Sequence, residues 1–306
     1  MCAGVRCYHA GMKITVKKMA MLLAMAVLTT ACQRSKEAPP SPVVQVKTPA
    51  AAPEAAAADS APQDPDELRM LELLHAIYGT PLKGPVITEL PDPDKRSEKG
   101  SYRITPIDMH EIGPGRVALV ASANYANDDN PSHGQPGLLN AYILQKQGDK
   151  WKVERRFENV AAMGTFGYLG SVAWVELGEG RPGFAIEWGG TWQGISVGYF
   201  SLFDLTDPKL RDLATKVGVA RSDNEGDCGE HRDRCWNVEG KWRFERVAQQ
   251  TYDDLVFDFS GYTESRPEDS TETVARSRTV VNNTARYAFR DGEYVLASGE
   301  HSAPNP

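Results

Sequence analysis

From about Tyr102 the sequence pattern takes a period of two, and ten strand-like segments lie between residues 116 and 297. A period of two puts every second side chain on the same face, which is typical of strands that cover a core on one side. Most of the segments are rich in β-branched or aromatic residues, which favour strands. They are Arg116–Ala126, Leu139–Leu144, Trp151–Phe157, Gly170–Val175, Gly183–Trp188, Ser196–Phe203, Lys241–Val247, Leu255–Phe259, Arg286–Phe289 and Glu293–Ala297.

Two helices are predicted beside these strands. Asp64 is a suitable N-cap, Pro65 suits the first helical position, and Gly79 is a suitable C-terminal stop. The segment Lys209–Val219 favours a second, short helix. The predicted fold of residues 64–306 is therefore mainly β, a curved antiparallel meander with one N-terminal helix. The meander is either a partial β-propeller or a sandwich.

Three short stretches repeat one pattern. Gly148–Glu154, Glu239–Glu245 and Asp291–Leu296 each place a glycine turn before a strand that opens with an aromatic residue. They predict three units, at about 102–160, 170–247 and 252–298. In outline these units resemble single blades of FG-GAP-type β-propellers. The acidic calcium-binding turn of that family is absent, replaced by shorter turns such as Leu177–Arg181, so the resemblance implies no binding residues here.

The N-terminal region has the pattern of an export signal. Three lysines between residues 13 and 18 precede the ten-residue apolar run Met19–Leu28, which is too short to span a bilayer core of about 30 Å. Small residues then lead to Cys32. This arrangement resembles the lipobox of bacterial lipoproteins, although Thr29 stands where that family usually has leucine. The resemblance implies that Cys32 receives a diacylglycerol group and becomes the first mature residue. Plain secretion is the alternative.

The chain is expected to start at Met12, so that residues 1–31 contain the signal peptide and residues 32–63 form a lipid anchor and linker. Glu37–Gln63 holds 6 prolines and 9 alanines in 27 residues, a composition typical of an extended tether. Loss of residues 1–31 leaves 30 basic residues against 41 acidic ones, a net charge of about −11. Such a chain lacks the basic surface that nucleic acid requires.

Cys228 and Cys235 are the pair that remains once Cys32 carries the lipid and the upstream cysteines are removed. One even pair in an oxidising compartment predicts a structural disulfide. His231 lies between the two cysteines, but three donors are one short of a structural zinc site, and the loop lacks the glycine and glutamate positions of an EF-hand. We expect neither a metal nor a cofactor.

The richest candidate ligand-binding surface is formed by Trp188, Gly189, Gly190 and Trp192. Exposed tryptophans around a glycine turn can stack on a sugar or a peptide, because they combine an apolar face with a polar N–H group. The alternative is a hairpin that packs its tryptophans into the core. The loop Asn127–Gly134 is expected to be solvated, with ligand binding as the alternative.

One catalytic motif is present. Gly194–Gly198 matches the Gly-x-Ser-x-Gly pattern of the α/β-hydrolase nucleophile elbow, with Ser196 at its centre. The pattern requires a helix after the serine, whereas the residues that follow have a strand pattern. Asp204 or Asp207, and then His231 or His301, follow Ser196 in a suitable chain order. Ser196 is therefore predicted to be a strand residue, and an envelope serine hydrolase is the alternative function.

Together these features predict a lipid-anchored protein on the periplasmic face of the outer membrane. Gln33 follows the lipidated cysteine, and lipoproteins that remain at the inner membrane tend to have aspartate there. The β domain is expected to bind a periplasmic ligand, an envelope protein or a glycan rather than to catalyse a reaction. The anchor to the membrane is the N-terminal lipid.

Overall fold

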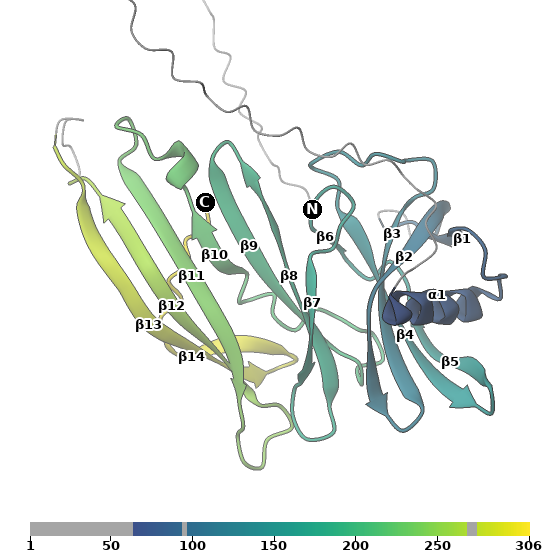
Figure 1. Cartoon of the computed structure of the whole chain (residues 1–306). Coiled ribbons are helices and arrows are strands. Elements are labelled where there is room, and N and C mark those ends of the chain that lie inside the picture. Colours follow the sequence, from purple (N-terminus) through teal and green to yellow (C-terminus); the bar gives the residue numbers. More distant parts are fainter. Residues whose placement is uncertain (1–63, 94–96, 268–273) are drawn as a thin grey trace, which may run out of the picture. The chain divides into compact units, whose positions relative to one another are not determined.

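The computed structural model describes residues 64–93, 97–267 and 274–306. This part of the chain is mostly β structure with a single α-helix, as Figure 1 shows. The mainly-β prediction is therefore confirmed. The predicted signal peptide, Cys32 and the linker up to residue 63 lie outside the described residues.

Helix α1 (Pro65–Tyr78) begins and ends where its sequence predicts. The Oδ1 atom of Asp64 accepts a hydrogen bond from the backbone N–H of Asp66 over 2.9 Å. Gly79 follows the helix with a φ of 64°, a left-handed conformation that glycine adopts without steric cost. Both ends of the helix are thus determined by local residues.

The first sheet has six antiparallel strands. Strands β1 to β5 follow one another in space as they do in sequence, and the short strand β6 pairs with β4. The strands are β1 (Val86–Pro91), β2 (Lys99–Gly113), β3 (Arg116–Tyr125), β4 (Gly137–Gln147), β5 (Lys150–Phe157) and β6 (Ala162–Met163).

The second sheet has eight antiparallel strands, again in the order of the chain. It curls into a half-barrel, which runs from teal to yellow in Figure 1. A short 3₁₀ helix, η1 (Glu225–Asp227), follows β10. The strands are β7 (Ser171–Glu176), β8 (Pro182–Trp192), β9 (Ile195–Asp204), β10 (Val219–Asp223), β11 (Arg234–Glu245), β12 (Asp254–Ser265), β13 (Ser277–Arg290) and β14 (Glu293–Gly299).

Three clusters of buried side chains hold helix α1 and the two sheets together. Helix α1 packs on one face of the first sheet, around Tyr102. The opposite face of that sheet places Val120 in one cluster with Phe184 of the second sheet. The third cluster belongs to the second sheet and includes Phe257. Because each fully buried aromatic ring contributes roughly 2–3 kcal/mol, these clusters fix the sheet that carries the candidate site.

The predicted helix at Lys209–Val219 is wrong, because residues 209–218 form a loop with turns and Val219 begins β10. Leu210 has a φ of 45°, which ends any helical path. The segment divides its apolar side chains between two cores, with Leu210 in the cluster between the sheets and Leu213 in that of the second sheet. Asp212 holds the loop, since its Oδ1 atom accepts from the backbone N–H groups of Leu202 and Ala214.

The predicted turn at Gly240 is also wrong, because β11 runs straight through it and pairs Gly240 with Phe259. A Cβ atom at Gly240 would lie 2.6 Å from the Phe259 ring, so close packing explains this glycine. The turns at Gly148 and Gly292 do join neighbouring strands. Units 170–247 and 252–298 are not separate blades, since β11 and β12 pair along their length within one sheet.

Candidate functional site

A groove of about 590 Å³ lies on the second sheet where β7 to β11 come together. Three of the four predicted ligand-binding residues, Trp188, Gly189 and Gly190, line it. The other lining residues include polar or charged side chains of the same strands, namely Ser171, Glu187, Thr191, Ser196, Arg221, Asp223, Asn237 and Glu239. The groove is therefore mainly polar, and it combines residues far apart in the chain.

Glycines make room for the groove. Gly189 of β8 and Gly198 of β9 face each other in register. The side chain of Arg221 passes over Gly198, where a Cβ atom would lie 2.6 Å from the arginine Nε. A larger residue at position 198 would displace Arg221, so Gly198 allows the arginine to lie low across the sheet, while a Cβ atom at Gly189 would lie against the backbone of Val197.

Three charged side chains in the groove have no ion pair or side-chain hydrogen bond with any other described residue: Arg221, Asp223 and Glu239. Arg221 is the register partner of Glu239 on the neighbouring strand. A fourth charged residue, Glu187, accepts a hydrogen bond from Trp242 Nε1 over 2.8 Å. With three carboxylates and one guanidinium, the charged side chains of the groove have a negative net charge. Most of their hydrogen-bond donors and acceptors face solvent.

The two predicted tryptophans have different surroundings. Trp188 is half-buried, stacks on Tyr199 at a centroid distance of 4.5 Å and donates from Nε1 to Ser201 Oγ. Trp192 lies outside the groove lining and is 42% exposed. The sequence left open whether the tryptophans pack into the protein or face solvent. In the structure, Trp188 packs against its neighbours and Trp192 remains open to solvent.

Trp192 belongs to an aromatic stack that joins the end of β8 to two separate loops. Its ring lies 5.3 Å from the imidazole of His133, and that imidazole lies 4.9 Å from the ring of Phe166. His133 belongs to the loop Asn127–Gly134, which was predicted to be solvated. Phe166 gave no sequence signal, because an isolated aromatic residue in a glycine-rich loop has no periodic context. Phe166, His133 and Trp192 are called the aromatic stack below.

Ser196 lies inside β9, as predicted, and no helix follows it. Its Oγ atom hydrogen-bonds to Thr191 Oγ1 over 2.9 Å. The two candidate histidines have other partners, because His231 lies 3.9 Å from an Asp227 oxygen and His301 Nδ1 lies 2.6 Å from the Tyr287 hydroxyl. No described histidine hydrogen-bonds to Ser196, so the geometry supplies no general base for a nucleophilic serine.

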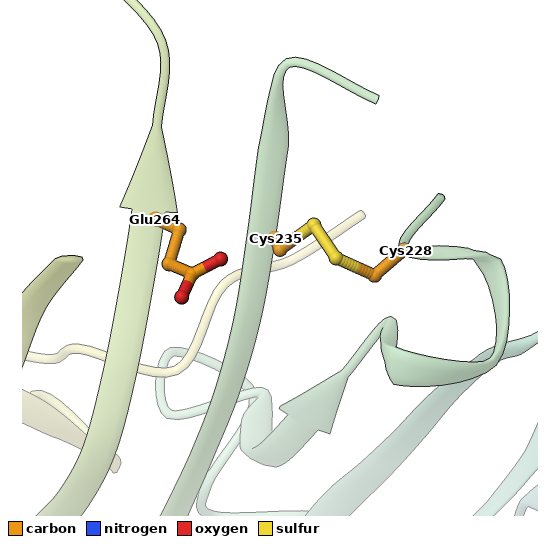
Figure 2. A group of neighbouring side chains, drawn as sticks. All are labelled: Cys228, Cys235 and Glu264. Carbon is orange, nitrogen blue, oxygen red and sulfur yellow. A yellow bond between two sulfur atoms is a disulfide. The ribbon is translucent and has the colours of Figure 1, made fainter. Parts of the chain in front are cut away.

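The predicted disulfide between Cys228 and Cys235 is present, with a Cα–Cα distance of 5.6 Å. Glu264 of β12 lies beside it, as Figure 2 shows. The carboxylate of Glu264 pairs with Arg276 at 3.3 Å and with Arg278 at 2.7 Å. Because the two sulfur atoms are bonded to each other and the carboxylate is neutralised by arginines, this cluster is a structural contact and does not fit a cation.

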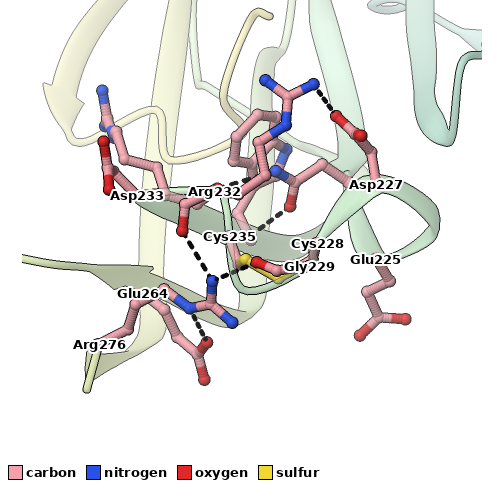
Figure 3. Close-up of a disulfide and its surroundings, with 12 residues drawn as sticks. Glu225, Asp227, Cys228, Gly229, Arg232, Asp233, Cys235, Glu264 and Arg276 are labelled. Atoms are coloured by element: carbon pink, nitrogen blue, oxygen red, sulfur yellow. Dashed lines mark hydrogen bonds and ion pairs between the residues drawn. A yellow bond between two sulfur atoms is a disulfide. The ribbon is translucent and has the colours of Figure 1, made fainter. Parts of the chain in front are cut away.

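The disulfide loop is also held from the neighbouring strands. Arg276 Nη1 donates to the carbonyl oxygens of Gly229 and Arg232, over 2.9 and 2.8 Å (Figure 3). Arg232 itself pairs with Asp227. The helix η1, which ends just before Cys228, borders the tip of the β8–β9 hairpin, where a Cβ atom at Gly194 would lie 2.5 Å from the backbone of Gly226. The contact to the end of the hairpin that carries Trp192 thus comes from the segment directly before the disulfide.

Asp204, considered as a partner for Ser196, belongs instead to a buried ion pair. Its fully buried carboxylate accepts hydrogen bonds from Arg181 Nη1 at 2.6 Å and from the Tyr252 hydroxyl at 2.7 Å. Burial by itself raises the pKa of Asp204, but hydrogen bonds from Thr206, Tyr252 and Arg181 outweigh it and lower that pKa. Burial, together with the hydrogen bond to Asp204, raises the pKa of Tyr252 to about 12. This network is structural.

Comparison of the chain with protein-family models, curated proteins and solved structures finds no match. Among the described residues, the helix is neither long enough nor apolar enough to cross a membrane. The function is therefore inferred from the residues of the groove, from the aromatic stack and from the N-terminal sequence.

Proposed function

We propose that this chain is a lipid-anchored envelope protein whose β domain binds a polar ligand in the groove between β7 and β11. The observation that carries the proposal is the set of unpaired charges, Arg221, Asp223 and Glu239, around a glycine floor. Two other arginines of the second sheet, Arg243 and Arg286, instead form ion pairs with Glu245. Charges without internal partners in a concave surface are available to hydrogen-bond a ligand.

The anchor part of the proposal rests on the sequence. The basic flank, the short apolar run and Cys32 suit lipidation, and the Pro/Ala-rich linker suits a tether between membrane and domain. A diacylated and further acylated terminus attaches durably, because more than one acyl chain holds it. A protein held in this way stays near the glycans and proteins of the envelope.

The lipid anchor is tested by intact mass and membrane fractionation of the full chain in a Gram-negative host, with Cys32→Ala for comparison. The expected mature species begins at Cys32, carries acyl mass and sediments with the outer membrane. The Cys32→Ala variant should lack the acyl mass and leave that fraction. A native chain recovered without acyl mass would contradict the anchor.

The groove is tested by tryptophan fluorescence, since Trp188 lines it and Trp242 hydrogen-bonds to Glu187. The probes are amino acids and neutral oligosaccharides, titrated into the full chain. Arg221→Gln and Asp223→Asn remove the charge at nearly constant size, and each should weaken binding about tenfold, the value of one charged hydrogen bond. Val280→Ala on β13 is the control. Binding that both groove variants retain would refute this site.

A further inference from the structure

The unpaired charges of the groove share one face of the second sheet. Arg221 and Asp223 are two residues apart on β10, so their side chains point to the same face. Between these two residues, the pairing of β10 with β9 and with β11 has no register shift. Two rows of residues therefore cross this face from β8 to β11, and all of them line the groove. They are Gly189, Gly198, Arg221 and Glu239 in the first row and Thr191, Ser196, Asp223 and Asn237 in the second.

The aromatic stack is not part of this face. Trp192 follows Thr191 directly on β8, and successive side chains of a strand point to opposite faces. Phe166, at the other end of the aromatic stack, has a φ of 52°, a left-handed conformation that bulky residues rarely adopt. None of its three residues lines the groove. The ligand class is therefore inferred from the two rows alone.

Arg221 leans away from the nearest carboxylate. Glu239 on β11 is its register partner, yet no ion pair joins these two described residues. The arginine instead passes over Gly198 on the other side of β10, where a Cβ atom would lie 2.5 Å from the arginine Cγ and 2.6 Å from its Nε. The positive charge is thus displaced toward β9, while the carboxylates belong to β10 and β11.

The space beside the guanidinium suits a carboxylate. Gly189 and Gly198 face each other in the first row, and neither has a side chain to cover the sheet. A planar guanidinium with free N–H groups binds a carboxylate through two parallel hydrogen bonds. The guanidinium above these glycines therefore forms an anion-binding end of the groove.

The opposite end of the groove suits an ammonium group. Asp223 is half-buried, and neither it nor Glu239 has an ion pair or side-chain hydrogen bond with another described residue. Ionised carboxylates only accept hydrogen bonds, and an ammonium group only donates them. The groove therefore offers separate sites for a negative and a positive group of one ligand.

The separation of the two ends sets the length of that ligand. Neighbouring strands lie about 4.8 Å apart, so ends on β9 and on β10 or β11 are separated by about 5–10 Å. A single α-amino acid carries both charges on one carbon and is too short, whereas a peptide extends about 3.3–3.6 Å per residue. We propose that the groove binds a short zwitterionic peptide of about two or three residues, with its carboxylate on Arg221 and its ammonium group between Asp223 and Glu239; this rests on the groove being the ligand site proposed above.

The proposal is tested by calorimetric titration of the full chain in a neutral polyoxyethylene detergent. The probes are tri-alanine, its N-acetyl form, its C-terminal amide, alanine itself and maltotriose. Arg221→Gln changes the anion-binding end, and the double variant Asp223→Asn, Glu239→Gln changes the ammonium end. Lys150→Gln, which removes an exposed positive charge from β5 of the first sheet, is the control. The blocked peptides are tested on the native chain, so their result is independent of how the variants fold.

Tri-alanine should bind, and alanine, the N-acetyl form and the amide should each bind about tenfold more weakly or worse, the value of one charged hydrogen bond. Arg221→Gln should weaken tri-alanine by a similar factor and leave the affinity for the amide unchanged. The double variant should do the same for tri-alanine and the N-acetyl form, and Lys150→Gln should have no effect.

Equal affinity for tri-alanine and its amide would overturn the role of Arg221, and equal affinity for alanine and tri-alanine would overturn the peptide. Maltotriose binding that the groove variants weaken, without binding of any peptide, would overturn the zwitterionic ligand and leave the groove as a ligand site. Peptide binding that all groove variants retain would refute the groove itself, and with it the proposed function.

Discussion

Arg276 donates a hydrogen bond to the carbonyl oxygen of Gly229 over 2.9 Å. The bond joins the residue that precedes β13 to the residue that follows Cys228. A second arginine, Arg266, donates to the carbonyl oxygen of Glu230 over 2.6 Å, and its side chain is only 6% exposed. The loop closed by the disulfide is therefore secured both covalently and by hydrogen bonds from the residue after β12 and the residue before β13.

Removal of the disulfide should lower the free energy of unfolding by about 2–3 kcal/mol, the value for so short a closed loop. The test is urea unfolding of the Cys228→Ser, Cys235→Ser double variant beside the native protein with and without reductant. The reduced native protein should match the variant, and the reductant should not change the variant. Equal stability of the oxidised and variant proteins would show that the arginine contacts alone hold the loop.

Asp204→Asn should lower the free energy of unfolding by about 2–4 kcal/mol, because it leaves Arg181 with a neutral partner in a mostly buried site. Since hydrogen bonds keep the pKa of Asp204 below its unfolded value, this carboxylate stabilises the fold above about pH 4 and loses that effect as the pH falls through the lowered pKa. Urea unfolding between pH 7 and pH 3 should show the two proteins converging.

The matched control is Tyr252→Phe, which removes a single hydrogen bond to the same carboxylate and should cost about 1 kcal/mol. A larger loss in Tyr252→Phe than in Asp204→Asn would contradict the view that the charge of Asp204 dominates this network.

His301 should make stability depend on pH near neutrality. Burial lowers the pKa of His301, and a hydrogen bond with the backbone of Val219 partly opposes this. The native histidine thus stays neutral where the unfolded one, with a pKa of about 6.5, takes up a proton. Stability should be complete above that value and decline as the pH falls through it toward the lowered native pKa. In His301→Gln, the decline between pH 7 and pH 5.5 should disappear.

Phe166 offers a test of strain. Phe166→Gly should relieve the left-handed backbone, worth about 1–2 kcal/mol, against an entropic cost of about 0.5–1 kcal/mol for glycine. Phe166→Ala keeps the strain, and both variants lose the ring contact with His133. Thermal and urea unfolding should therefore find the glycine variant more stable than the alanine variant by about 1 kcal/mol. An alanine variant at least as stable as glycine would mean that position 166 is not strained.

Ser196→Ala tests the hydrolase alternative. Loss of the hydrogen bond to Thr191 should cost less than about 1 kcal/mol, since the pair is exposed. A fluorophosphonate probe should label neither the native protein nor the variant, because no described histidine activates the hydroxyl. Labelling of the native protein that the variant loses would establish a nucleophilic Ser196.

Local signals in the sequence predicted a large part of the fold. The caps of α1 directly flank the helix, and β5 shows the alternation that burial on one face imposes, whereas β3 and β4 are buried on both faces. Strand β10 was missed because its polar residues show no alternation, and it is held by pairing with β9 and β11. The segment 209–219 was predicted to be a helix from the spacing of its apolar residues. In the structure these side chains pack into two different cores and do not form one helical face.

The candidate site was only partly predictable. Trp188, Gly189 and Gly190 are adjacent in the chain, so the sequence alone indicates them as a candidate ligand-binding surface. Arg221 and Glu239 become neighbours only through strand register, which one sequence does not reveal. Phe166 and His133 meet through two distant loops, and no periodic pattern links them.

The order of strands in the half-barrel has a consequence for how the domain is made. From β8 to β14 each strand hydrogen-bonds to the strand before it in the chain, so each new strand finds its partner already present. Contacts between segments that are close in sequence form quickly, and few strand edges stay unpaired until a distant segment has folded. A chain delivered across a membrane from its N-terminal end could therefore assemble this sheet progressively, one hairpin at a time.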